Sequence, residues 1–154
     1  MVSGISAGKN NRKSMRRPKI VPGTKVAAKV PQSQQGEENG SWILCSVHRY
    51  YSNIDKYEVL DIDDSSKAVI VSSNHVIRLD DSILGAQKGD DVLAMFPETT
   101  IFYRGKIAKT LKKNSRDILV QFEDDEDETG KTPSRRILAE FVLPLSRLTD
   151  ANLI

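Results

Sequence analysis

Three aromatic residues in the second half of the chain have the types and the spacing to bind a methylated ammonium group. Phe96, Tyr103 and Phe122 lie at the ends of three predicted β-strands, and the acidic residues 123–125 follow at once. In an antiparallel meander these strand ends meet at one mouth of a barrel, on its inward-facing side. Aromatic faces attract a desolvated cation by about 0.5–2 kcal/mol, and carboxylates at the rim suit its charge. We therefore predict an aromatic cage of these three rings, with Asp124 beside it.

The same rings have an alternative role as packing inside the barrel. Phe96 has the most core-like neighbours and fits this alternative as well as it fits the cage, whereas Tyr103 and Phe122 flank loops. Replacing Tyr103 or Phe122 by alanine is therefore expected to remove discrimination between methylated and unmethylated ligands and to leave the fold intact. Phe102 has the opposite parity and corresponds to Trp42, so both are expected to pack between two barrels.

An acidic pair in the first half of the chain is a second candidate site. Asp61 and Asp63 follow a predicted strand and share one face of it, so both carboxylates can point at one cation. The free α-amino group of a peptide, or an arginine, would suit them through charge-assisted hydrogen bonds. The alternative is an acidic turn that is simply solvated.

The elements that position these residues are predicted to be short β-strands. From residue 21 onward, apolar and polar residues alternate in short runs, and no window of helical length keeps a 3.6-residue period. Val26 and Ala28 share one strand face, as do Cys45 and Val47 on the next strand. Ala68 and Ile70 are expected to share a face in the same way.

The two halves of this pattern align with each other. The matching segments are residues 23–28 with 89–94, 42–47 with 102–107, 57–64 with 118–125, and 76–79 with 142–145. Each unit of about 60 residues has the size of an SH3-like or Tudor-like barrel, which alone has a thin core. We therefore predict an all-β fold of two tandem SH3-like or Tudor-like barrels packed together. The predicted boundaries are residues 19–83 for the first barrel, 84–148 for the second and 149–154 for a C-terminal tail.

Charge is distributed unevenly along the chain. The first 20 residues contain six basic residues and no acidic one, whereas the remaining 134 contain 17 basic and 21 acidic residues, a net charge of −4. The first segment is also poor in large apolar residues and cannot offset the entropy of ordering. Residues 1–18 are therefore predicted to form a disordered basic arm, either a solvated linker or a segment for nuclear targeting or nucleic-acid contact.

The composition argues against several functional classes. Cys45 is the single cysteine and is predicted to be buried, and His48 and His75 have no obvious partner, so neither a cysteine-based zinc site nor a catalytic centre is expected. No apolar run approaches the roughly 20 residues that span a bilayer, and no signal peptide follows Met1. We expect a protein that is not an enzyme and that uses no metal, cofactor or membrane.

Several motifs together resemble a known family. The segments GTKVAA, WILC, YEVLDID, LAMFPETTIFY and QFED are similar to the tandem-Tudor domain of the SAGA-associated factor twenty-nine family, whose members are subunits of the SAGA histone-acetyltransferase complex. The likeness covers roughly residues 19–148. Phe96 stands where relatives can carry tyrosine, so a hydroxyl contact is lost while ring stacking is kept. The N-terminal coiled-coil region of that family is absent, so the chain is expected to be a fragment.

The resemblance implies a nuclear reader of histone H3 tails that carry di- or trimethylated lysine at the fourth position. It implies that the cage residues, with Asp124 nearby, bind the methyl-lysine, and that Asp61 and Asp63 bind the N-terminal alanine of the tail. Other SAGA subunits would bind through regions outside this chain, and any acetyl transfer would belong to a partner subunit. The acidic body also suits a basic tail.

Two alternatives remain open at this point. Tandem small barrels with a basic arm can bind nucleic acid, although the negative charge of the body argues against the body as the main surface. Tudor aromatics can also bind methylarginine, and the acidic pair disfavours this only through the resemblance.

Overall fold

The structure is a computed structural model, and it describes residues 19–32, 37–79, 86–110 and 116–148. The basic arm of residues 1–18, the boundary predicted between residues 83 and 84, and the tail of residues 149–154 lie outside the described residues.

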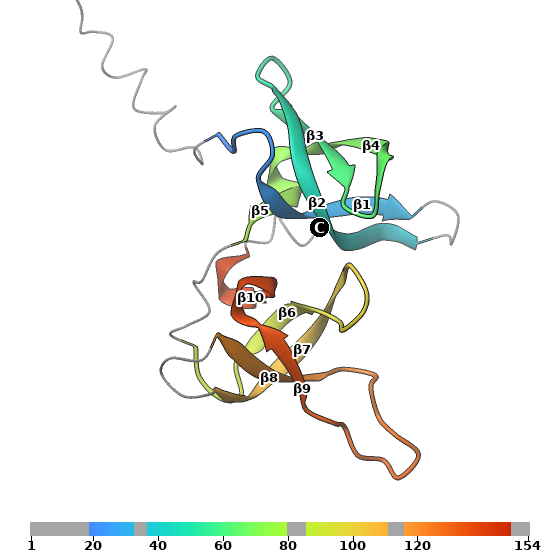
Figure 1. Cartoon of the computed structure of the whole chain (residues 1–154), viewed down its shortest axis with the longest axis vertical. Helices are drawn as coiled ribbons and strands as arrows, with labels where there is room; N and C mark the ends of the chain where they lie inside the picture. Colours follow the sequence, from blue (N-terminus) through green and yellow to red (C-terminus); the bar gives the residue numbers. More distant parts are fainter. Residues whose placement is uncertain (1–18, 33–36, 80–85, 111–115, 149–154) are drawn as a thin grey trace, which may run out of the picture.

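Within these residues, ten β-strands form one sheet that folds into two halves (Figure 1), which confirms the predicted all-β class. The first half contains β1 (Lys25–Gln32), β2 (Glu37–Tyr51), β3 (Lys56–Asp61), β4 (Asp64–Ser72) and β5 (Val76–Arg78). The second half contains β6 (Asp91–Met95), β7 (Ile101–Thr110), β8 (Asp117–Phe122), β9 (Arg135–Leu138) and β10 (Val142–Pro144). Three 3₁₀ turns follow strands: η2 (Ser73–His75), η4 (Ala139–Phe141) and η5 (Leu145–Arg147).

The two halves repeat the same antiparallel pairing. β1 pairs with β2 and β5, and β3 pairs with β2 and β4; in the second half β6 pairs with β7 and β10, and β8 with β7 and β9. The entry turns match as well. The Gly23 amide donates to the carbonyl of Val47 (N···O 2.7 Å), and the Gly89 amide donates to the carbonyl of Ile107 (2.8 Å). Both glycines have φ near +92°, a conformation that other residues rarely adopt. The duplication predicted from the sequence extends to individual hydrogen bonds.

Each half closes around its own apolar core. In the first, the inward faces of β1, β2 and β3 supply the buried side chains of Val26, Cys45 and Val59. In the second, the equivalent strands supply Val92 and Val120. Burial of these alternating positions follows the pattern that predicted the strands.

A third core joins the halves. β2 pairs with β7, with Trp42 opposite Phe102, so the sheet continues from one half into the other. The buried side chains of this inter-barrel core come from both halves: Ala27, Trp42, Leu44, Ile77, Leu93, Phe102, Leu143 and Leu148. The expectation that Trp42 and Phe102 pack between the barrels is confirmed.

One strand face differs from the simplest expectation. Ala68 and Ile70 on β4 do share a face, but this face is exposed to solvent, and Val71 is the buried residue. Residues 68–71 are all apolar, so the sequence there has no alternation that could indicate which face packs inward.

Candidate functional site

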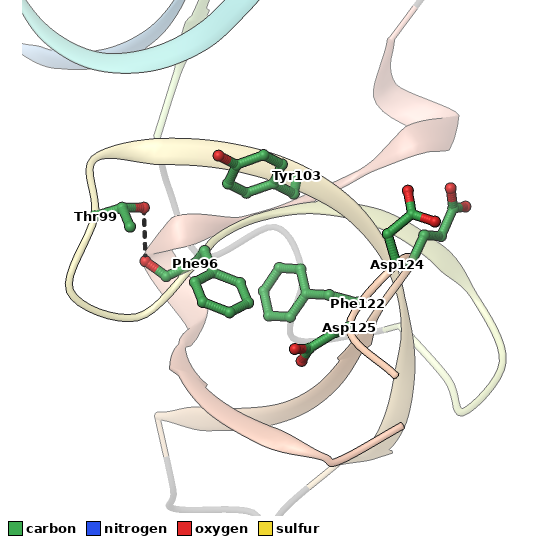
Figure 2. A pocket seen from close by; sticks show the side chains of 7 residues that line it. Phe96, Thr99, Tyr103, Phe122, Asp124 and Asp125 are labelled. Carbon is green, nitrogen blue, oxygen red and sulfur yellow. Dashed lines mark hydrogen bonds between the residues drawn. The ribbon is translucent and has the colours of Figure 1, made fainter. Parts of the chain in front are cut away.

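A cavity of about 410 Å³ opens at one end of the second barrel (Figure 2). Its lining residues are Phe96, Thr99, Tyr103, Phe122, Glu123, Asp124 and Asp125. The structure thus brings together the four residues predicted as a cage, and it adds Thr99, Glu123 and Asp125 to them. The volume lies within the range of about 300–1,000 Å³ that is usual for small-ligand sites.

The Phe96 ring stands at a steep angle to each of the other two rings. The Phe96 centroid lies 6.0 Å from that of Tyr103 with an interplanar angle of 85°, and 5.0 Å from that of Phe122 with an angle of 63°. Phe122 is only 2% exposed, whereas Tyr103 is 46% exposed. Phe122 is therefore the most buried of the three rings and Tyr103 the most exposed. Figure 2 shows how the rings and the acidic residues lie around the cavity. Phe96 is half-buried and packs against the second core while it also lines the cavity.

The loop between β6 and β7 fixes the position of Phe96. The Phe96 amide donates to the carbonyl of Ile101 (N···O 3.0 Å). The Thr99 hydroxyl donates to the carbonyl of Phe96 (2.9 Å) and accepts from the amide of Ile101 (3.1 Å). Thr99 thus holds the loop closed. Sequence reasoning did not single out this residue, although a threonine in a short loop commonly bonds to nearby backbone in this way.

The acidic rim follows from a sharp change of direction after β8. The Glu123 amide still donates to the carbonyl of Arg104 on β7 (3.0 Å), and Asp124 then takes a left-handed conformation with φ of 63°. Aspartate is one of the few residues other than glycine that tolerates this conformation. The turn leaves Glu123 and Asp124 exposed beside the rings.

Asp125 differs from its neighbours because it is paired. Arg135 on β9 donates from Nε to Asp125 Oδ2 (2.7 Å) and from Nη2 to Asp125 Oδ1 (3.1 Å). The hydrogen bond from Arg135 lowers the pKa of the Asp125 carboxyl and raises the pKa of the guanidinium. The guanidinium carbon also lies 4.7 Å from the centroid of the Phe96 ring. Sequence reasoning missed Arg135, because nothing near it in the chain marks a basic strand residue as part of this site.

The acidic pair predicted in the first half lies outside this cavity. Asp61 and Asp63 flank the tight turn between β3 and β4, where the Asp63 amide donates to Asp61 Oδ1 (2.8 Å). Asp61 is half-buried and Asp63 is exposed. One carboxylate oxygen of Asp61 is therefore already engaged in holding the turn, which orients the group.

One backbone residue connects the two candidate sites. The Leu44 amide donates to the carbonyl of Thr100 in the loop beside the cavity (2.8 Å), and the Leu44 carbonyl accepts from the amide of Ile62 (3.3 Å). Ile62 lies between the two aspartates of the acidic pair. Leu44 on β2 is thus hydrogen-bonded both to the turn of the first barrel and to the loop of the second.

Three further features were considered in the described part of the chain: a reactive thiol, a metal site and a membrane-spanning helix. Burial raises the pKa of the Cys45 thiol to about 12, with the charge of Asp61 adding to the effect, so the thiol is a poor nucleophile. No group of three or more His, Cys, Asp or Glu side chains is arranged to hold a metal ion there. The described helices are all too short to cross a membrane.

Comparison with known proteins gives consistent matches. A profile of the SGF29 tudor-like domain matches residues 22–146. The chain is similar to SAGA-associated factor 29kDa of Drosophila melanogaster, with 28% identity over 118 residues, which is 70% of this chain and 40% of that protein. It is also similar to the SAGA complex subunit Sgf29 of Schizosaccharomyces pombe, with 33% identity over 122 residues, or 73% of this chain and 48% of that protein. The chain therefore spans less than half the length of each relative.

Among solved structures, Arabidopsis thaliana AGDP1 AGD34 aligns with 91% of this chain and 89% of that chain. The sequence identity is 15% and the TM-score 0.43, which is too low to establish a shared fold.

Proposed function

Because the chain belongs to the SGF29 tudor-like domain family, we propose that it binds chromatin as part of a SAGA complex in the nucleus. The specific ligand in this proposal is the N-terminal tail of histone H3 with di- or trimethylated lysine at the fourth position. A Tudor-like domain of this family is a binding module and not an enzyme. Both relatives are named for SAGA, which supports the assignment of this chain to such a complex.

The observation that carries the proposal is the cavity lined by three aromatic rings and an acidic rim. A trimethylated ammonium has no proton to donate, so a hydrogen-bonding pocket would gain nothing from it, whereas aromatic faces attract its charge. Rings at steep angles present several faces or edges to one bound group. Since Arg135 neutralises Asp125, the net negative charge at the rim comes from Glu123 and Asp124.

The acidic pair would bind the free amino terminus of the same tail. Asp61 and Asp63 offer carboxylates on the first barrel, and charge-assisted hydrogen bonds from an α-ammonium are among the stronger polar contacts. The backbone of Leu44 bonds to residues beside both sites, which supports a proposal in which one tail places its terminus and its methyl-lysine together. In this proposal residues 19–83 form the terminus-binding barrel and residues 84–148 the methyl-lysine barrel.

A calorimetric titration with matched histone H3 N-terminal peptides tests the proposal. The peptides are identical except for trimethylation of the fourth-position lysine, and the expected preference is about tenfold, or about 1.4 kcal/mol. Equal affinity for both peptides would contradict methyl-lysine binding and leave an acidic module for basic tails. Absence of binding to either peptide would favour a nucleic-acid or scaffold role instead.

Two further peptides separate the components of the proposal. N-acetylation removes the positive charge of the terminus and is expected to abolish most of the binding if Asp61 and Asp63 hold a free amine. A peptide with methylated arginine in place of methyl-lysine is expected to bind weakly. If acetylation has no effect and the methylarginine peptide binds better, the chain is a methylarginine reader.

A further inference from the structure

We propose that Arg135 and Asp125 form a clamp that holds the Phe96 ring in place as a cage wall and so sets the selectivity of the cavity for methylated ammonium groups. This inference rests on the proposed function. Arg135 is a positioning residue, because it acts on the ligand through Phe96.

The contacts of the pair define the clamp. Both guanidinium bonds go to one carboxylate, at 2.7 and 3.1 Å, which fixes the plane of the guanidinium as well as its position. The guanidinium then lies over the Phe96 ring, 4.7 Å from its centroid. Asp125 lines the cavity and Arg135 does not, so in this proposal the guanidinium supports the Phe96 ring from the side away from the ligand. The side chains are 35% and 16% exposed, so solvent screens the pair only in part.

Phe96 lies in a loop whose hydrogen bonds hold its backbone, so the orientation of its ring depends on side-chain contacts. Phe96 follows the last residue of β6, and the Arg135 guanidinium carbon lies 4.7 Å from the centroid of its ring. Its aromatic neighbours are Tyr103 and Phe122, which are themselves cavity residues, and it also packs against the edge of the second core. Removal of the guanidinium would therefore leave the outer side of the ring without its stacking partner and allow the ring to turn away from the ligand.

The charges of the clamp matter as much as its shape. An unpaired guanidinium behind Phe96 would oppose the approach of a second cation to the ring, and the carboxylate of Asp125 cancels that effect. The effect of removing Arg135 therefore distinguishes two roles of Asp125, as a rim charge or as part of the clamp. If Asp125 were only one more acidic residue of the rim, removal of Arg135 would release its charge and tighten the binding of a cation. If the pair is a clamp, the same change weakens binding.

The test compares Arg135→Gln with Arg136→Gln as a matched control. Arg136 is the next residue on β9, points to the opposite face, is 63% exposed and pairs with Asp117 at 3.1 Å. Both substitutions remove one positive charge from the same strand. We expect Arg135→Gln to weaken the trimethylated H3 peptide by about three- to tenfold and to change the unmethylated peptide by less than about twofold. We expect Arg136→Gln to leave the ratio of the two affinities unchanged.

Two additional variants keep the test independent of a folding defect. Asp125→Asn leaves the guanidinium uncompensated and is expected to weaken the methylated peptide at least as much as Arg135→Gln. Arg135→Lys keeps the charge but cannot make the planar, bidentate contact, so it is expected to restore little selectivity. Thermal unfolding of each variant identifies any loss of the folded state.

A measurement on the ligand-free protein tests the stacking directly. The NMR signal of the Arg135 Nε–H proton is expected to be shifted upfield by the Phe96 ring current, and this shift is expected to disappear in Phe96→Leu. Unchanged or tighter binding of the methylated peptide to folded Arg135→Gln overturns the clamp and leaves the proposed function standing. A wild-type protein without methyl preference overturns the proposed function, and the clamp with it.

Discussion

Alanine substitution of Tyr103 is expected to remove a ligand contact at small cost to the fold, whereas the same change at Phe122 should damage both. Phe122 is 2% exposed and belongs to the second core, and removal of a buried phenylalanine ring typically costs about 3–5 kcal/mol. Tyr103 is 46% exposed, so roughly half of an aromatic surface of about 200 Å² is covered. At about 25 cal/mol per Å², and allowing for a compact unfolded chain, Tyr103→Ala should cost about 1.5–2.3 kcal/mol.

The expected effects on binding are similar for the two substitutions. Each removes one ring from the cavity, which should weaken a methylated peptide by about 0.5–2 kcal/mol, or about 2- to 30-fold. Calorimetric titration of methylated and unmethylated peptides gives the ratio of affinities, and thermal unfolding of the same samples gives the change in stability. Tyr103→Phe is the matched control, because it keeps the ring, and its affinity should stay within about twofold of wild type.

Either of two results would refute this reasoning. One is a Tyr103→Ala protein that keeps the full preference for the methylated peptide, because the rim ring would then make no contact with the methyl-lysine. The other is a Phe122→Ala protein as stable as wild type, because the ring would then not belong to the core. The sequence led us to expect that both substitutions spare the fold. The exposure of Tyr103 agrees with that expectation, whereas the burial of Phe122 argues against it.

Four further predictions concern other parts of the molecule. Asp63→Ala should weaken methylated and unmethylated peptides to the same extent in calorimetry, and a loss confined to the methylated peptide would contradict its role at the amino terminus. Gly105→Ala should destabilise the protein by about 1–3 kcal/mol in urea unfolding, because the new Cβ would lie 2.7 Å from a carbonyl oxygen of β8. Unchanged stability would show that β8 can move away from the added methyl group. The hydrogen bond from Arg135 lowers the pKa of Asp125, so the wild type should have a larger free energy of unfolding than Asp125→Asn at pH values above the ordinary carboxyl range near pH 4. This difference should vanish as the pH falls through the lowered pKa. A difference that persists at the lowest pH would contradict the ion pair. With the pKa of its thiol raised to about 12, Cys45 should resist a thiol reagent at pH 8 until the protein is unfolded, and rapid labelling of the folded protein would disprove its burial.

The position of the cavity could be predicted from sequence because it depends on strand ends. Phe96, Tyr103 and Phe122 belong to consecutive antiparallel strands or follow them directly, so pairing alone brings them to one end of the barrel. The inter-barrel packing of Trp42 and Phe102 followed from parity in the same way. Alternation carries this information wherever one strand face is polar and the other apolar.

The parts that sequence did not reveal depend on contacts between distant residues, on local backbone geometry, or on a run without alternation. Arg135 reaches Phe96 and Asp125 only because β9 pairs with β8, and a basic strand residue has no local signal for such a contact. The outward face of β4 was ambiguous because residues 68–71 are uniformly apolar. The engagement of Asp61 in its own turn depends on backbone geometry that side-chain type does not specify.

The inter-barrel core has a consequence for how the chain folds. An isolated first half would leave Trp42 and Leu44 uncovered and would expose the edge of β2 that pairs with β7. Such an unpaired strand beside apolar side chains is prone to associate with other chains. Neither half is therefore expected to be an autonomous folding unit, and the two barrels should unfold together in a single cooperative transition.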